Sequence, residues 1–224
     1  MKKTVLVSGA NRGIGLALVQ RFRARGDDVV ALCRHSSEAL EASGARIESG
    51  IDVTDDAALA TLADRLSDSR IDVLVLNAGI LGRESLGGID DEGFDSMRRQ
   101  FEVNALGPLR VTQALLDRLA DTAKIGIVTS RMGSVADNGS GGRYGYRASK
   151  AAVNAIGKSL AVDLQPRGIA VFLLHPGYVA TDMVGGTGDV TPQQAAERLV
   201  ERLDTLTLEQ TGTFWHANGD PLPW

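Results

Sequence analysis

Short apolar runs alternate with longer segments that have the apolar spacing of amphipathic helices, from one end of the chain to the other. The apolar runs are rich in Val, Leu and Ile, and each one predicts a buried strand. They are residues 3–8, 28–33, 45–50, 71–76, 124–130, 169–175 and 212–215. The helical spacing covers residues 14–25, 36–42, 55–67, 91–104, 106–120, 145–165 and 191–204.

Strands that are apolar on both faces are typical of a parallel sheet with helices on each side. We therefore predict an α/β fold, a doubly wound parallel sheet (Rossmann fold) of about seven strands in the order 3-2-1-4-5-6-7. The helix at 55–67 is expected to use Thr54 as its N-cap. No linker or composition break interrupts the pattern, so residues 1–224 are expected to form one domain.

Composition narrows the function classes. The 224 residues carry a net charge of −4 without a basic run, which gives no support to nucleic-acid binding. No apolar stretch is long enough to span a membrane, and the single cysteine, Cys33, suits a reducing compartment. The three histidines lack metal-ligand spacing, so no metal is expected. These features predict a cytoplasmic protein.

The candidate chemistry is concentrated in the stretch from 125 to 158. Ser130 ends a predicted strand, and Tyr146 and Lys150 stand four residues apart on a predicted helix, which places them on one face. An ammonium beside a phenol lowers its pKa and suits it to proton transfer, while a serine hydroxyl can hold the substrate oxygen. Tyr-x-x-x-Lys alone is common on helices, so the rest of the chain must decide.

A glycine-rich loop follows the first strand directly. Gly9, Gly13 and Gly15 lie between that strand and the first helix, where a pyrophosphate can rest on the helix N-terminus. After the second strand stands Arg34 rather than an acidic residue, with Arg12 as a second cation. Because guanidinium groups pair with phosphate, the sequence favours NADP(H) over NAD(H), although both arginines could be ordinary surface residues.

Taken together, these motifs resemble the short-chain dehydrogenase/reductase family over essentially the whole chain. The closest likeness is to its small carbonyl-reductase branch, which includes the C-factor proteins, through SRMGSVADNGSGGRYGYRASK and GDPLPW. The motifs occur in the family's order: Ser8–Gly15, Asp52-Val53, Asn77-Ala78-Gly79, Asn104, Ser130, Tyr146 with Lys150, and His175–Thr181.

The resemblance implies a role for each matching residue. Tyr146 would be the general acid in carbonyl reduction, Ser130 would position the carbonyl, and Lys150 would hold the nicotinamide ribose and lower the Tyr146 pKa. Asn104 would hold a relay water. The implied cofactor contacts are Gly9, Asn11, Arg12, Gly13, Ile14, Gly15, Arg34, Asp52, Val53, Asn77, Ala78, Gly79, Tyr146, Lys150, Pro176, Gly177, Val179 and Thr181.

Asn104 also has an argument from the residues themselves. Its carbonyl would accept a helical bond from residue 108, which is Pro108 and has no N–H. The carbonyl is therefore expected to be free, unless Gly107 and Pro108 merely kink the helix.

Other details stay open at this level. Ser134 and Ser140 are alternatives to Ser130, and Tyr144 is an alternative phenol without a lysine four residues later. Candidate substrate contacts are Ile80, Leu81, Met132, Tyr144, Tyr178 and Met183, with Arg83 and Arg131 as nearby charges. The glycines of the short 183–190 segment indicate a mobile lid.

The sequence thus predicts an NADP(H)-dependent carbonyl reductase for an aldehyde, ketone or quinone. The alternatives are a C-factor-like signalling protein with little turnover, or a structural partner protein. A homodimer or a homotetramer is compatible with each of these hypotheses.

Overall fold

The structure is a computed structural model that describes residues 2–224. Seven parallel strands form one sheet in the order β3-β2-β1-β4-β5-β6-β7, which confirms the predicted topology. The strands are β1 (Thr4–Ser8), β2 (Asp28–Leu32), β3 (Arg46–Glu48), β4 (Ile71–Leu76), β5 (Leu119–Val128), β6 (Ala170–His175) and β7 (Thr213–His216).

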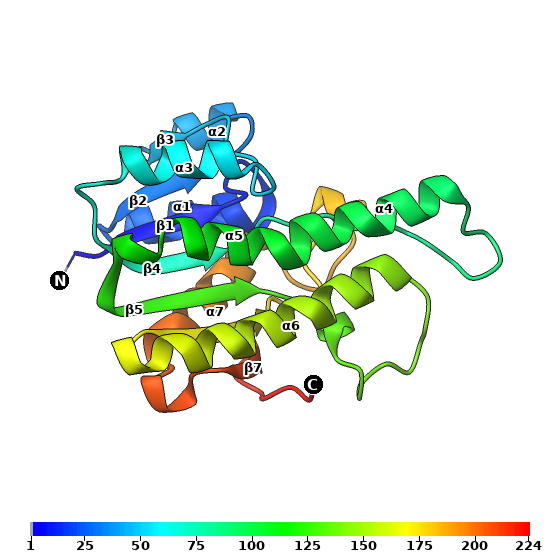
Figure 1. Cartoon of the computed structure of the whole chain (residues 1–224). Coiled ribbons are helices and arrows are strands. Elements are labelled where there is room, and N and C mark those ends of the chain that lie inside the picture. Colours follow the sequence, from blue (N-terminus) through cyan, green and yellow to red (C-terminus); the bar gives the residue numbers. More distant parts are fainter. Residues whose placement is uncertain (1) are drawn as a thin grey trace.

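Seven α-helices surround the sheet (Figure 1). They are α1 (Gly13–Ala24), α2 (Glu38–Glu41), α3 (Asp56–Arg65), α4 (Asp91–Phe101), α5 (Gly107–Ala114), α6 (Tyr144–Leu164) and α7 (Pro192–Thr205). Short turns of tighter or wider helix connect them. Among residues 2–224, no helix is both long and apolar enough to cross a lipid bilayer.

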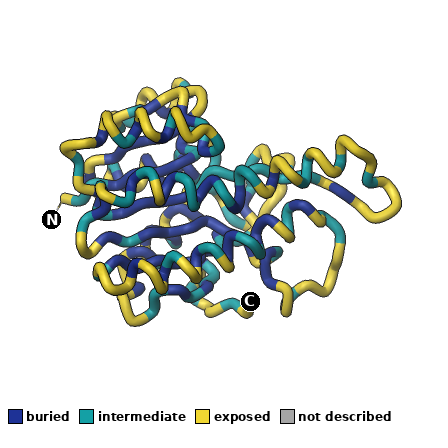
Figure 2. The backbone as a smooth tube through the Cα atoms, in the orientation of Figure 1, coloured by how far each residue is buried: buried dark blue, intermediate teal, exposed yellow. Residues whose placement is uncertain are grey.

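Each strand sends alternate side chains to two separate apolar cores. Leu6, Leu74 and Ile125 face the core under α3, α5 and α6, whereas Val5 and Val73 face the core under α1 and α7. This alternation follows from the two-residue period of a strand and explains why both faces read as apolar. Figure 2 shows the result: the central part of the sheet is buried, and most of the exposed backbone lies on helix surfaces and loops, while the exposed strand residues lie at the start of β2 and β3 and in the first half of β5.

The two helices predicted at 91–104 and 106–120 form one unbroken rod, and this part of the prediction is wrong in detail. A π-helical turn, η1 (Glu102–Leu106), joins α4 to α5, and the amide of Gly107 bonds to the carbonyl of Glu102. Pro108 stands at the start of α5, where its missing N–H is tolerated. The rod ends at Ala114, because a tighter turn and then β5 follow.

Two smaller expectations also need correction. The cap of α3 is Asp55, whose carboxylate accepts the amides of Ala57 and Ala58, and not Thr54. Thr54 instead donates its amide and hydroxyl to the carboxylate of Asp52. Strand β5 ends at Val128, so Ser130 lies two residues beyond the strand rather than within it.

Candidate active site

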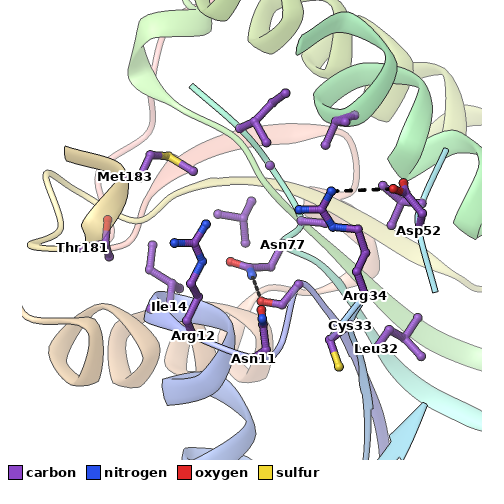
Figure 3. Close-up of a pocket in the computed structure, with 18 of the residues that line it drawn as sticks. Asn11, Arg12, Ile14, Leu32, Cys33, Arg34, Asp52, Asn77, Thr181 and Met183 are labelled. Carbon is purple, nitrogen blue, oxygen red and sulfur yellow. Dashed lines mark hydrogen bonds and ion pairs between the residues drawn. The ribbon is translucent and has the colours of Figure 1, made fainter. Parts of the chain in front are cut away.

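A cavity of about 750 Å³ runs along the carboxyl ends of the central strands. This is the edge where ligands bind in open α/β sheets. Most of the residues predicted to bind the cofactor line it: Gly9, Asn11, Arg12, Gly13, Ile14, Arg34, Asp52, Val53, Asn77, Ala78, Gly79, Tyr146, Lys150, Pro176 and Thr181. Figure 3 shows part of this wall, with Arg12 and Arg34 reaching into the cavity from two different loops.

The remaining predicted residues do not line the cavity wall. Gly15 packs inside the loop, where a Cβ atom would lie 2.1 Å from the carbonyl oxygen of Gly9. Gly177 and Val179 belong to the segment after β6, in which Val179 is buried and pairs with Val190. Ser130 and Asn104 are buried beside the cavity and act through the contacts described below.

The glycine-rich loop fits a diphosphate. Gly9 and Gly13 have φ values of 63° and 53°, which side chains rarely adopt. Arg12, the residue that precedes α1, makes no side-chain hydrogen bond to the helix, and the first turn of α1 contains no acidic residue. The first backbone amides of α1 therefore have no side-chain acceptor. These N–H groups can instead donate hydrogen bonds to an anion such as a diphosphate.

Asn77 lines the cavity, and its side chain also stabilises this loop. Its side-chain amide donates to the carbonyl oxygens of Ser8 and Gly9, both at 3.1 Å. In return, the hydroxyl of Ser8 accepts the backbone amides of Asn77 and Ala78. The ends of β1 and β4 are thus joined at the point where the loop must hold its shape.

One end of the cavity contains an ion pair. There, Arg34 lies 3.8 Å from the carboxylate of Asp52, and the two point toward one another in Figure 3. Burial raises the pKa of Asp52, but hydrogen bonds from Thr54 and the charges of Arg34 and Arg99 outweigh it, so the pKa is lowered. Asp52 is therefore ionised, and the exposed Arg34 guanidinium keeps room for a second anionic partner.

Tyr146 and Lys150 occupy the other end. Burial raises the pKa of Tyr146, while hydrogen bonding with the Ser130 side chain and the charge of Arg143 oppose that rise. The ammonium of Lys150 donates to the carbonyl of Val128 at 2.9 Å and lies 5.8 Å from the centre of the Tyr146 ring. Burial thus dominates the pKa of Tyr146 in this structure, and the lowering of that pKa by Lys150 stays a prediction.

Burial also lowers the pKa of Lys150, to about 8. Its side chain is nearly inaccessible, and desolvation disfavours the charged form. Because burial raises the pKa of Tyr146, this residue is a neutral phenol at neutral pH, which is the form that can donate a proton. The Ser130 hydroxyl accepts the backbone amide of Met132 at 3.1 Å, and its influence on the Tyr146 pKa places it near the phenol.

The side chain of Asn104 forms a clamp that the sequence did not reveal. Its oxygen accepts the amide of Ile80 at 2.8 Å, and its nitrogen donates to the carbonyl of Ile80 and to the hydroxyl of Ser149. The clamp joins the loop after β4 to α6. A Cβ at Gly79 would lie 3.2 Å from the Asn104 oxygen, which explains the glycine there.

The alternatives to the predicted serine are engaged elsewhere. The hydroxyl of Ser134 donates to the carbonyl of Trp224, and that of Ser140 accepts from Arg147. Of the candidate substrate contacts, Ile80 and Met183 line the cavity.

The sequence did not single out the part of α4 and η1 that lines the cavity. Arg99, Glu102 and Val103 lie there because the rod crosses the strand ends. Their spacing of three to four residues indicates a common helix face, but only the crossing of the rod shows what that face meets.

Comparisons with known proteins agree with this geometry. The family model described as short chain dehydrogenase matches residues 3–191. A 1-hydroxy-2-glutathionyl-2-methyl-3-butene dehydrogenase of Rhodococcus sp. (strain AD45) is 44% identical over 227 residues, covering 99% of each chain. The C-signal of Myxococcus xanthus is 41% identical over 169 residues, which cover 74% of this chain and 100% of that protein.

Solved structures show the same relationship. The carbonyl reductase Sniffer of D. melanogaster superimposes with a TM-score of 0.91 at 29% identity, over 100% of both chains. A carbonyl reductase from Pseudomonas aeruginosa PAO1 in complex with NADP superimposes with a TM-score of 0.87 at 32% identity, again over 100% of both chains. The chain therefore belongs to the short-chain dehydrogenase family and is an oxidoreductase.

Proposed function

We propose that the protein is an NADP(H)-dependent carbonyl reductase that converts an aldehyde, ketone or quinone to the alcohol. One observation carries the proposal: an uncapped helix start, the arginines Arg12 and Arg34, and the pair Tyr146 and Lys150 all line a single cavity. Among the structural relatives, carbonyl reductases from chicken fatty liver and from Pseudomonas aeruginosa PAO1 have NADPH or NADP bound.

Different residues of the cavity bind different parts of the cofactor. Gly9 and Gly13 let the backbone approach the diphosphate, and the first amides of α1 receive its charge. Arg34, supported by Arg12, receives the 2′-phosphate. When bound, the nicotinamide supplies a hydride to the carbonyl carbon.

The proton comes from the protein. Tyr146 donates its phenolic proton to the carbonyl oxygen, while the Ser130 hydroxyl holds that oxygen in place. Lys150 holds the ribose and, through its positive charge, stabilises the phenolate left on Tyr146. Asn104 fixes the loop at Ile80 that borders the reacting end.

The test is NADPH consumption against a panel of aldehydes, ketones and quinones, with NADH in parallel. Tyr146→Phe is expected to lower kcat by roughly 10²–10⁴-fold while leaving NADPH affinity intact, because only the proton donor is lost. Normal turnover by Tyr146→Phe would contradict the assignment.

A second candidate comes from the relatives. The Rhodococcus protein is named for the oxidation of a glutathionyl alcohol, and the Myxococcus protein is named as a signal. Glutathionyl alcohols with NADP⁺ and NAD⁺ therefore belong in the panel. Tight NADPH binding without turnover in either direction would favour the signalling reading.

A further inference from the structure

Helix α6 carries Tyr146 and Lys150, yet it begins without a cap of its own. The preceding residue, Arg143, has a left-handed conformation with φ 50° and ψ 48°, and its side chain makes no hydrogen bond to the helix. The first turn contains no acidic residue. Because a helix start leaves its first amides without partners, some other segment must stabilise the turn that contains Tyr146.

Glu84, in the loop between β4 and α4, supplies that stabilisation. Its backbone carbonyl accepts the amide of Arg143 at 2.9 Å, and its carboxylate accepts the amide of Gly145 at 3.4 Å. The carboxylate thus lies at the positive end of the α6 dipole, one residue from Tyr146. Glu84 is only 9% exposed, so it acts as a buried cap donated from outside the helix.

The carboxylate of Glu84 is itself held by α4. It accepts the side-chain amide of Gln100 at 2.5 Å and the hydroxyl of Ser96 at 3.1 Å. The side-chain oxygen of Gln100 in turn accepts the amide of Gly82 at 2.8 Å. A Cβ at Gly145 would lie 2.6 Å from the Gln100 amide, so the two helices meet without room for a side chain.

This arrangement repeats the Asn104 clamp one helical turn earlier. Gln100 and Asn104 are four residues apart, and each joins the backbone of the 80–84 loop to α6, the first through Glu84 and the second through Ser149. The starts of α4 and α6 extend beyond the carboxyl ends of the strands, where the sheet no longer supports them (Figure 1). Their relative position there depends on these polar contacts.

We propose that Glu84 and Gln100 are positioning residues of the reaction: their buried pair caps α6 from outside and fixes the Tyr146 phenol against Ser130. Neither residue touches the substrate, so the effect falls on the geometry of proton transfer. The expected effect on kcat rests on the proposed function. The capping of α6 by Glu84 and Gln100 does not depend on it.

The decisive variant is Glu84→Gln, which keeps the size of the side chain but leaves one acceptor oxygen for three donors, the Gln100 amide, the Ser96 hydroxyl and the Gly145 amide. Either the Gln100 amide or the Gly145 amide then faces an NH₂ group. We expect faster hydrogen exchange of the backbone amides in 143–149 and a fall in kcat of about tenfold or more, because small displacements of a reacting group are costly. The Kd for NADPH should change by less than about twofold, since no cofactor contact is lost.

A double variant tests geometry against general damage. Glu84→Gln combined with Gln100→Glu exchanges the two groups and restores a donor facing an acceptor, with the Gly145 amide again satisfied. It should recover kcat to within about threefold of the parent and restore slow exchange in 143–149. If Glu84→Gln alone fails to fold, recovery in the double variant still decides the proposal.

Asp55→Ala is the matched control, because it removes a carboxylate cap from α3, which carries no proposed catalytic side chain. It should lower stability without slowing kcat or loosening 143–149. Unchanged exchange at 143–149 in Glu84→Gln would overturn the proposal even if the protein reduces no carbonyl. Loosened exchange with unchanged kcat would overturn the positioning role alone, and so would a double variant no better than the single one.

Discussion

Lys150 is buried as a cation, and its replacement offers a test of the site that needs no substrate. Burial lowers its pKa from 10.5 to about 8. At about 1.4 kcal/mol per pKa unit, this corresponds to roughly 3 kcal/mol of stability that the folded protein lacks at neutral pH. Lys150→Met removes the charge and keeps a long, unbranched side chain.

The sign follows from proton binding. Between about pH 8 and 10.5, the unfolded chain holds a proton on this lysine that the folded chain has released, so the stability of the parent rises with pH in that window. Below about pH 8 both states are protonated and the penalty is fully present. The variant lacks the group, so its advantage over the parent is greatest below pH 8.

The expected magnitude includes one lost contact. The Lys150 ammonium donates to the carbonyl of Val128, and losing a hydrogen bond costs about 1 kcal/mol. Lys150→Met should therefore be more stable than the parent by about 2 kcal/mol at pH 7. This advantage should disappear by pH 10 to 10.5, while carbonyl reduction is lost at every pH.

The assay is urea unfolding of parent and variant at pH 7 and pH 10, with free energies from linear extrapolation. Lys158→Met is the control, because Lys158 is exposed on the same helix. A stability difference that does not change with pH, or a variant less stable than the parent at pH 7, would refute the reasoning.

Two further predictions concern the cofactor end. Arg34→Asp should weaken NADPH binding by about 10–100-fold, because a charge-assisted contact to the phosphate is lost, and should affect NADH binding much less. Titration of the variant with both cofactors measures this difference. Equal losses of affinity for both would show that Arg34 does not recognise the phosphate. Gly15→Ala would place a Cβ 2.1 Å from the Gly9 carbonyl oxygen, so unfolding free energy should fall by about 1–3 kcal/mol and NADPH affinity should drop, whereas Gly139→Ala, with open space around it, should change neither.

The sequence predicted most of the fold because each element carries its own periodic signal. Strand β4 and the helices α1 and α6 lie within a residue or two of the predicted bounds. The errors fall where local signals compete. The cap of α3 moved from Thr54 to Asp55, and the predicted break after Asn104 became a π-helical turn directly before Gly107 and Pro108.

For the site, the sequence by itself determined which chemical groups are present and in what order: the glycine loop, the arginines, and Ser130, Tyr146 and Lys150. Those residues lie within a few residues of a strand end or on one helix face, where local spacing predicts their neighbours. Only the tertiary structure decided the environment, because burial depends on residues far apart in the chain. It raised the pKa of Tyr146, lowered that of Lys150, and brought Glu84 to the start of α6.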